Sequence, residues 1–136
     1  MNQPELETFI SSLENVQQEE NFGYLFYFVG DDHRLSFVTI ANSDNEYDKV
    51  SNLNREDVFR LNIGVSKETF QQLIGKSSEE AIDYTQLNVF LPHPEYARQH
   101  FVCILNPSGE NVEVTKKLIG EAHAIATARY QRKAKE

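Results

Sequence analysis

Six polar side chains from three segments of the sequence could together bind a small anionic ligand. Arg60 and Asn62 lie two residues apart in a strand-like segment, which places both on one face of that strand. Arginine offers a planar fork to a carboxylate or phosphate, and asparagine offers both a donor and an acceptor. A proline corner at residues 92–94 fixes the backbone around a histidine and a tyrosine. The candidate ligand-binding residues are Arg60, Asn62, Asp48, Tyr84, His93 and Tyr96.

The same residues also have a purely structural explanation. Arg60 would then pair with an acidic residue from residues 44–48, and Asn62 would hold a loop in place. The ligand explanation requires that these groups converge on one cavity in the folded chain.

The residue types that most often carry catalysis or metal binding show no matching pattern. The four histidines form neither an H-x-x-x-H nor an H-x-H pair, and Cys103 is the single cysteine, within an apolar strand-like segment. There is no G-x-S-x-G motif and no glycine-rich phosphate loop. We therefore expect no catalytic residue, no metal and no cofactor. An enzyme with His93 as general base, near Tyr84 or Tyr96, is the remaining catalytic alternative.

The net charge of −8 is unevenly distributed along the 136 residues. Residues 1–57 hold 3 basic and 12 acidic side chains, whereas residues 101–136 hold 6 and 4. Such a field repels nucleic acid and anionic membranes over most of the surface. Three basic residues share one face of the last predicted helix: Arg129, Arg132 and Lys133. They form the alternative site, for DNA.

Targeting and membrane signals are missing from the sequence. The first 20 residues have no basic and apolar leader, and no segment reaches the roughly 18 apolar residues of a membrane span. With a single cysteine, we expect a reducing, cytoplasmic location.

Hydrophobic periodicity predicts a single domain over residues 1–136. A helix is predicted over residues 4–16, a β-hairpin over 21–42 with its turn at 30–32, a polar loop over 42–54 and a strand over 59–65. Ser66 caps a short helix that ends at Gly75. Residues 76–99 read as a short strand or an extended loop, followed by a strand over 100–105 and a long helix over 111–132. This order predicts an α+β fold, with an antiparallel sheet flanked by an N-terminal, a short middle and a long C-terminal helix.

Several short motifs resemble those of a bacterial family of functionally uncharacterised proteins. They read F-R-L-N-I-G-V-S at residues 59–66, D-Y-T at 83–85, P-H-P-E-Y at 92–96 and L-N-P-S at 105–108, and the resemblance covers residues 22–132. More distantly, the order of elements is similar to that of the MmcQ/YjbR family, with its R-L-N-like strand and its closing helix that ends in basic residues. That resemblance implies a "double wing" fold and a role in DNA binding.

Taken together, the sequence predicts a non-catalytic module that binds a small anionic ligand or a protein partner. The first alternative is a DNA-binding protein that uses the basic end of the last helix. The second is the enzyme with His93 as general base.

Overall fold

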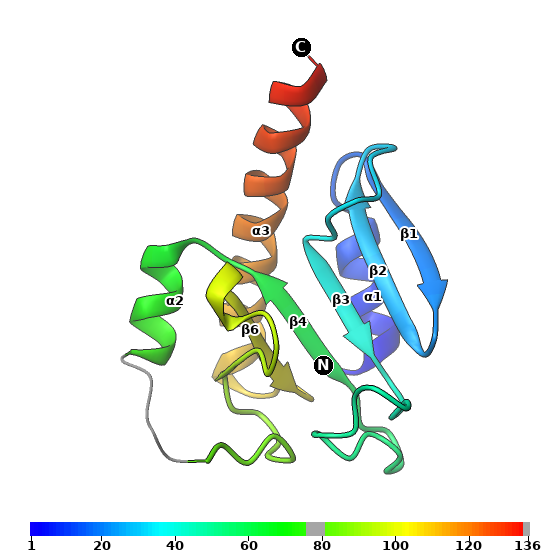
Figure 1. Cartoon of the computed structure of the whole chain (residues 1–136), viewed down its shortest axis with the longest axis vertical. Coiled ribbons are helices and arrows are strands. Elements are labelled where there is room, and N and C mark those ends of the chain that lie inside the picture. The colour runs from blue at the N-terminus through cyan, green and yellow to red at the C-terminus, as the bar shows by residue number, and fades with distance from the viewer. Residues whose placement is uncertain (76–80, 135–136) are drawn as a thin grey trace.

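The computed structural model describes residues 1–75 and 81–134. Of the segment 76–99, predicted as a short strand or an extended loop, residues 76–80 therefore lie outside the described residues. The described residues form an α+β fold, as predicted, with a six-stranded antiparallel sheet and three α-helices (Figure 1). The elements in chain order are α1 (Gln3–Ser11), β1 (Val16–Asn21), β2 (Tyr24–Val29), β3 (Val38–Ala41), β4 (Arg60–Gly64), α2 (Lys67–Ile74), β5 (Leu91–Pro92), the 3-10 turn η1 (Ala97–Gln99), β6 (Phe101–Leu105) and α3 (Glu110–Ala134).

The first strand corrects the sequence prediction. The predicted helix over residues 4–16 ends at Ser11, and Asn15 adopts a positive φ of 61°. The chain then forms β1, which pairs with β2 at the edge of the sheet. β1 leaves five of its six side chains exposed, so it carries no apolar alternation that would mark a strand. The predicted hairpin is the antiparallel pair of β2 and β3, whose connection runs from residue 30 to 37.

The sheet order is β1-β2-β3-β4-β6-β5, which makes β4 a central strand. Leu61 and Ile63 of β4 are completely buried, together with the apolar residues at every second position of the neighbouring strands. α1 and α3 cover this core face, and both lie behind the strands in Figure 1. The predicted alternation over residues 59–65 is confirmed, with one face of the strand in the core.

The opposite face of the sheet has no helix among the described elements packed on it. Neighbouring strands there align Tyr24 with Ala41 and Arg60 in one row, and Phe26 with Thr39, Asn62 and Cys103 in the next. The loop at residues 42–59 and the segment at residues 91–100 border this open face. This open face carries polar and aromatic side chains, and beside them Ala41 and Leu105 form a small apolar cluster with Leu53 of the loop.

Local signals in the sequence explain where the helices begin and end. Asn2 caps α1 in a reciprocal capping box with Glu5, and Ser66 caps α2 by accepting the backbone N–H of Thr69. Gly75 ends α2 with φ 72°, as predicted. Pro92 lies in β5 at the edge of the sheet, where a missing N–H is tolerated. None of the helices in the described ranges combines the length and apolarity that a bilayer crossing requires.

Candidate functional site

A groove of about 970 Å³ runs over the open face of the sheet. Its floor is formed by β2, β3 and β4, and its sides by the β3–β4 loop, the β5–β6 segment and one flank of α3. Five of the six residues predicted for a ligand site line it: Asp48, Arg60, Asn62, His93 and Tyr96. The structure therefore brings together residues that are up to 48 positions apart in the sequence.

Arg60 is the centre of the polar floor. Its side chain is completely buried, and its guanidinium donates to both carboxylate oxygens of Asp48, at 3.2 Å (Nη1 to Oδ1) and 2.5 Å (Nη2 to Oδ2). Nη1 also donates to Ser51 Oγ at 3.1 Å, and Nε donates to Asn62 Oδ1 at 3.1 Å. Arg60 thus pairs with an acidic residue from residues 44–48, as its structural explanation requires, and this pair lies within the candidate site.

The ion pair is held in its charged form. Burial favours a neutral Asp48, but hydrogen bonds from Arg60 and Tyr24 outweigh it and lower the pKa of this carboxyl group. Burial likewise acts against the charge of Arg60, and Asp48 more than offsets it, so the pKa of Arg60 is raised. Tyr24 donates its hydroxyl to Asp48 Oδ2 at 2.6 Å, and burial with this hydrogen bond raises the pKa of Tyr24 to about 12. The pair is therefore charged and mutually neutralised at neutral pH.

Asn62 extends the polar floor across the sheet. Because its Oδ1 faces the Nε–H of Arg60, its Nδ2 must face the other way, and it donates to Thr39 Oγ1 at 2.8 Å. Asn62 is 2% exposed and Thr39 is 9% exposed. A continuous chain of hydrogen bonds thus runs from Asp48 through Arg60 and Asn62 to Thr39.

His93 lines the groove beside this chain and is 8% exposed. Its Nδ1 accepts the backbone N–H groups of Glu95 and Tyr96, both at 3.0 Å. Burial, followed by the positive charge of Arg60, lowers the pKa of His93 to about 4. The ring is therefore neutral at pH 7, and since Nδ1 is an acceptor, the hydrogen resides on Nε2.

Aromatic rings form much of the groove wall. The rings of Tyr24 and Phe26 on β2 lie 5.7 Å apart, and Tyr96 meets Phe101 edge to face at 6.3 Å. Tyr96 also lies 4.9 Å from the ring of His93. At the rim, Phe22 is 81% exposed and Tyr47 is 87% exposed. Such rings give an aromatic or flat apolar molecule surfaces to stack on.

The charges that line the groove balance. Three cationic side chains face three carboxylates: Arg34, Arg60 and Arg129, and Glu46, Asp48 and Glu95. His93 adds no charge at neutral pH because of its low pKa. The groove therefore differs from the protein as a whole, which has a net charge of −8.

Tyr84 is the predicted site residue that does not line the groove. It is half-buried, and burial raises the pKa of its hydroxyl, with a smaller contribution from Cys103. Cys103 itself is completely buried in β6, and burial raises the pKa of its thiol to about 12. No group of three metal-ligating side chains occurs within residues 1–75 and 81–134.

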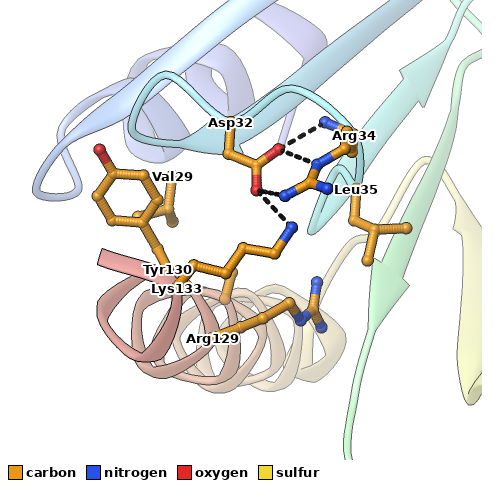
Figure 2. A pocket seen from close by; sticks show the side chains of 8 residues that line it. Val29, Asp32, Arg34, Leu35, Arg129, Tyr130 and Lys133 are labelled. Carbon is orange, nitrogen blue, oxygen red and sulfur yellow. Dashed lines mark hydrogen bonds and ion pairs between the residues drawn. The ribbon is translucent and has the colours of Figure 1, made fainter. Parts of the chain in front are cut away.

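The basic residues predicted for DNA binding lie near the end of α3, and Figure 2 shows Arg129 and Lys133 next to the turn between β2 and β3. Lys133 Nζ pairs with Asp32 Oδ2 at 3.1 Å, and Arg34 forms two further contacts with the same carboxylate. Arg129 lines the same small pocket as Asp32 and Lys133, although no dashed line joins it to them in Figure 2, and it also lines the groove. Arg132 is exposed. Of the three residues, Lys133 is thus engaged in an ion pair within its own chain.

Three residues that line the groove were not predicted from the sequence: Tyr24, Phe26 and Thr39. Tyr24 and Phe26 fall within the hairpin predicted over residues 21–42, and the structure shows that both are half-buried and line the groove. Their spacing of two, shared with the pair Arg60 and Asn62, was the available signal that they lie on one face. Thr39 carried no signal of its own, because a threonine in a strand is common.

The chain belongs to a family of unknown function, DUF6194, whose family model matches residues 1–135. No curated protein and no solved structure matches the chain.

Proposed function

We propose that this protein is a non-catalytic module that binds one small, largely apolar molecule in the groove over the open sheet face. The observation that supports the proposal is the groove itself, with a volume of about 970 Å³, aromatic walls and a buried polar floor. Sites for small molecules are concave and mostly apolar, with a few fixed polar groups that orient the ligand. The Asp48–Arg60–Asn62–Thr39 chain supplies such fixed groups.

The charge balance favours a neutral ligand over the anion expected from the sequence. That expectation depended on a guanidinium available at Arg60, and Asp48 already occupies both of its terminal nitrogens. An anion would have to compete with a carboxylate of the same chain for this guanidinium, and the groove offers it no net positive charge. The anionic ligand and the protein partner remain the outcomes against which the neutral ligand is tested.

Two fluorescent probes of matched shape separate these outcomes. N-phenyl-1-naphthylamine is uncharged, and 8-anilinonaphthalene-1-sulfonate adds one sulfonate to the same ring system. The protein has no tryptophan, so no indole absorption interferes with their excitation. We expect saturable binding of the uncharged probe at one site per chain. Much tighter binding of the sulfonate probe would instead support an anionic ligand. If neither probe binds saturably, a protein partner becomes the favoured alternative.

Variants locate the binding site. Tyr96→Ala removes a half-exposed ring from the groove wall and should weaken binding of the uncharged probe about 2- to 10-fold. Leu87→Ala is the matched control, because Leu87 is 47% exposed and lies outside the groove. Equal affinities in the two variants would contradict binding in the groove.

The geometry of His93 supports binding over general-base catalysis. In the neutral ring, Nδ1 is occupied by two backbone N–H groups and Nε2 carries the hydrogen. A general base needs a free lone pair directed at the substrate. His93 is thus arranged as a hydrogen-bond donor.

DNA binding through α3, and with it the distant likeness to the MmcQ/YjbR family, stays a prediction. The pairing of Lys133 with Asp32 and the net charge of −8 both weaken it. If α3 binds DNA, the protein should shift the mobility of duplex DNA at low salt. This shift should be lost when Arg129, Arg132 and Lys133 are changed to alanine. A shift that these changes leave intact would rule out this helix as the contact.

A further inference from the structure

We infer that the groove selects a planar, uncharged ligand with a carbonyl-type oxygen, and that this oxygen accepts a hydrogen bond from Nε2 of His93, with the hydroxyl of Thr39 as a second donor on the same floor. The inference rests on the proposed function and deepens it by naming the chemical class of the ligand.

The first observation is an unused donor on a buried ring. His93 is 8% exposed and lines the groove, and its Nδ1 is engaged by the backbone of residues 95 and 96. Its Nε2 has no hydrogen-bond partner among residues 1–75 and 81–134, and it is not one of the side-chain atoms there that are sealed from solvent, so this N–H stays accessible in the groove. Ligand sites orient their ligands through a few fixed polar groups, and an accessible donor in the wall of a groove can fill this role toward an acceptor.

The position of that donor is fixed by its surroundings. The backbone N–H of His93 donates to Phe101 O at 2.9 Å, which ties the segment to β6. The ring lies against those of Tyr96, at 4.9 Å between centroids, and Phe101, at 6.3 Å. With Nδ1 also held by two backbone groups, the ring cannot turn without breaking several contacts. The donor is therefore preorganised, which lowers the entropic cost of binding.

The second observation concerns Thr39, which is 9% exposed in the middle of the floor. Its Oγ1 accepts a hydrogen bond from Asn62, and in the described part of the chain no acceptor faces its own O–H. By contrast, the neighbouring acceptor oxygens of Asp48, Ser51 and Asn62 all receive hydrogen bonds already. The hydroxyl of Thr39 is thus an unpaired donor on a floor whose acceptor oxygens each already receive a hydrogen bond, so the group on a ligand that it favours is an acceptor.

The third observation is the shape and charge of the surrounding wall. The rings of Tyr24 and Phe26 on one side, and of Tyr96 and Phe101 on the other, favour a flat molecule that stacks. The balanced charges of the lining favour an acceptor without a formal charge. An aromatic ketone, aldehyde or amide has this combination of properties.

The test compares two uncharged naphthalene probes that differ in the acceptor. 6-Propionyl-2-(dimethylamino)naphthalene carries a ketone, and its emission moves to longer wavelength when the carbonyl accepts a hydrogen bond. N-phenyl-1-naphthylamine has no carbonyl. His93→Asn is the informative variant, because the asparagine Oδ1 can replace Nδ1 toward residues 95 and 96 while the donor at Nε2 is removed.

We expect His93→Asn to weaken binding of the ketone about 3- to 10-fold and to shift its bound emission to shorter wavelength, as the loss of one hydrogen bond predicts. Binding of N-phenyl-1-naphthylamine should stay within about twofold of wild type, since it makes no such bond. Thr39→Val should act in the same direction, and Thr39→Ser, which keeps the hydroxyl, should behave like wild type. If His93→Asn does not fold, the comparison of Thr39→Val with Thr39→Ser tests the inference.

Two results overturn the inference in distinguishable ways. If N-phenyl-1-naphthylamine binds in the groove but neither His93→Asn nor Thr39→Val affects the ketone selectively, the assigned acceptor is wrong while the groove remains a binding site. If neither probe binds the wild-type protein saturably, the proposed function fails and the inference fails with it.

Discussion

Arg60 and Asp48 form a two-pronged ion pair in which the guanidinium is completely buried and the carboxylate side chain is 14% exposed. The pair joins a central strand to the middle of the β3–β4 loop, across 12 positions of sequence. It therefore fixes both the polar floor of the groove and the path of the loop beside it.

Removing one partner of this ion pair should be strongly destabilising. Asp48→Ala leaves the buried charge of Arg60 without its partner, and we expect the free energy of unfolding to fall by about 3–5 kcal/mol in urea denaturation. Glu46→Ala is the control, because Glu46 is exposed in the same loop and should change stability by less than about 0.5 kcal/mol. An Asp48→Ala protein as stable as the control would show that the pair contributes little.

A double variant separates the interaction from the cost of an unpaired charge. Arg60→Met removes the cation that Asp48→Ala would otherwise strand in the interior. We expect the double variant to be less destabilised than the sum of the two single variants, because residues in direct contact are not additive. Strict additivity in the denaturation series would argue against coupling.

The low pKa of His93 should make stability fall as the solution is acidified. The unfolded chain takes up a proton on this residue near pH 6.5, whereas the folded protein does so only near pH 4. Between these values the unfolded state binds more protons, so the free energy of unfolding should decrease by up to about 3 kcal/mol from pH 6.5 to pH 4. His93→Asn should flatten this part of the profile. A wild-type profile that runs parallel to that of the variant would contradict the shift.

Gly30 holds a position that a larger residue should not tolerate. Its φ is +70°, and a Cβ atom there would lie 2.4 Å from Cζ of Tyr130 on α3. Gly30→Ala should cost at least about 2 kcal/mol, from backbone strain and displacement of the ring. The control is Gly120→Ala in the exposed middle of α3, where nothing lies within 4 Å and a gain of about 0.5–1 kcal/mol is expected.

The two causes at Gly30 can be measured separately. Tyr130 contacts the β2–β3 turn, where its hydroxyl donates to Asp31 Oδ1 at 3.0 Å, and Figure 2 shows its ring beside Val29. In a Tyr130→Ala background, Gly30→Ala should retain only the cost of the positive φ, about 1 kcal/mol. The same cost in both backgrounds would mean that the ring is not the obstacle.

Cys103 should be inert in the native protein. It is completely buried, and burial raises the pKa of its thiol to about 12, so the reactive thiolate is scarce at neutral pH. A thiol reagent should label it slowly under native conditions and within the mixing time in denaturant. Rapid native labelling would reveal frequent opening of β6.

Parts of the fold were predictable because their signals are local. Ser66 and Gly75 mark the ends of α2, and the alternation around Leu61 identifies β4 as a half-buried strand. β1 was not predictable in this way, since an edge strand is held by backbone pairing with β2 and its exposed side chains follow no apolar period. The predicted α+β class is nevertheless correct, because the other strands and helices are sufficient to define it.

The candidate site depends on contacts that no local pattern encodes. Arg60 was expected to pair with an acidic residue from residues 44–48, and Asp48 is that residue. The same contact neutralises the positive charge of Arg60, on which the prediction of an anionic ligand depended. His93 was singled out by its residue type, but its role as a donor depends on two backbone groups that the turn after Pro94 brings to Nδ1. Tyr84 was also predicted as a site residue from its residue type, and it lies outside the groove.

The floor of the groove belongs to central strands, whereas the exposed rings at its rim belong to turns and loops, such as Phe22 in the β1–β2 turn and Tyr47 in the β3–β4 loop. A floor fixed by strand register resists change, while loops accept substitutions and altered length at little cost to folding. Members of one family could therefore keep the same polar anchor and yet accommodate molecules of different size. Ligand preference would then be adjustable by changing the rim alone.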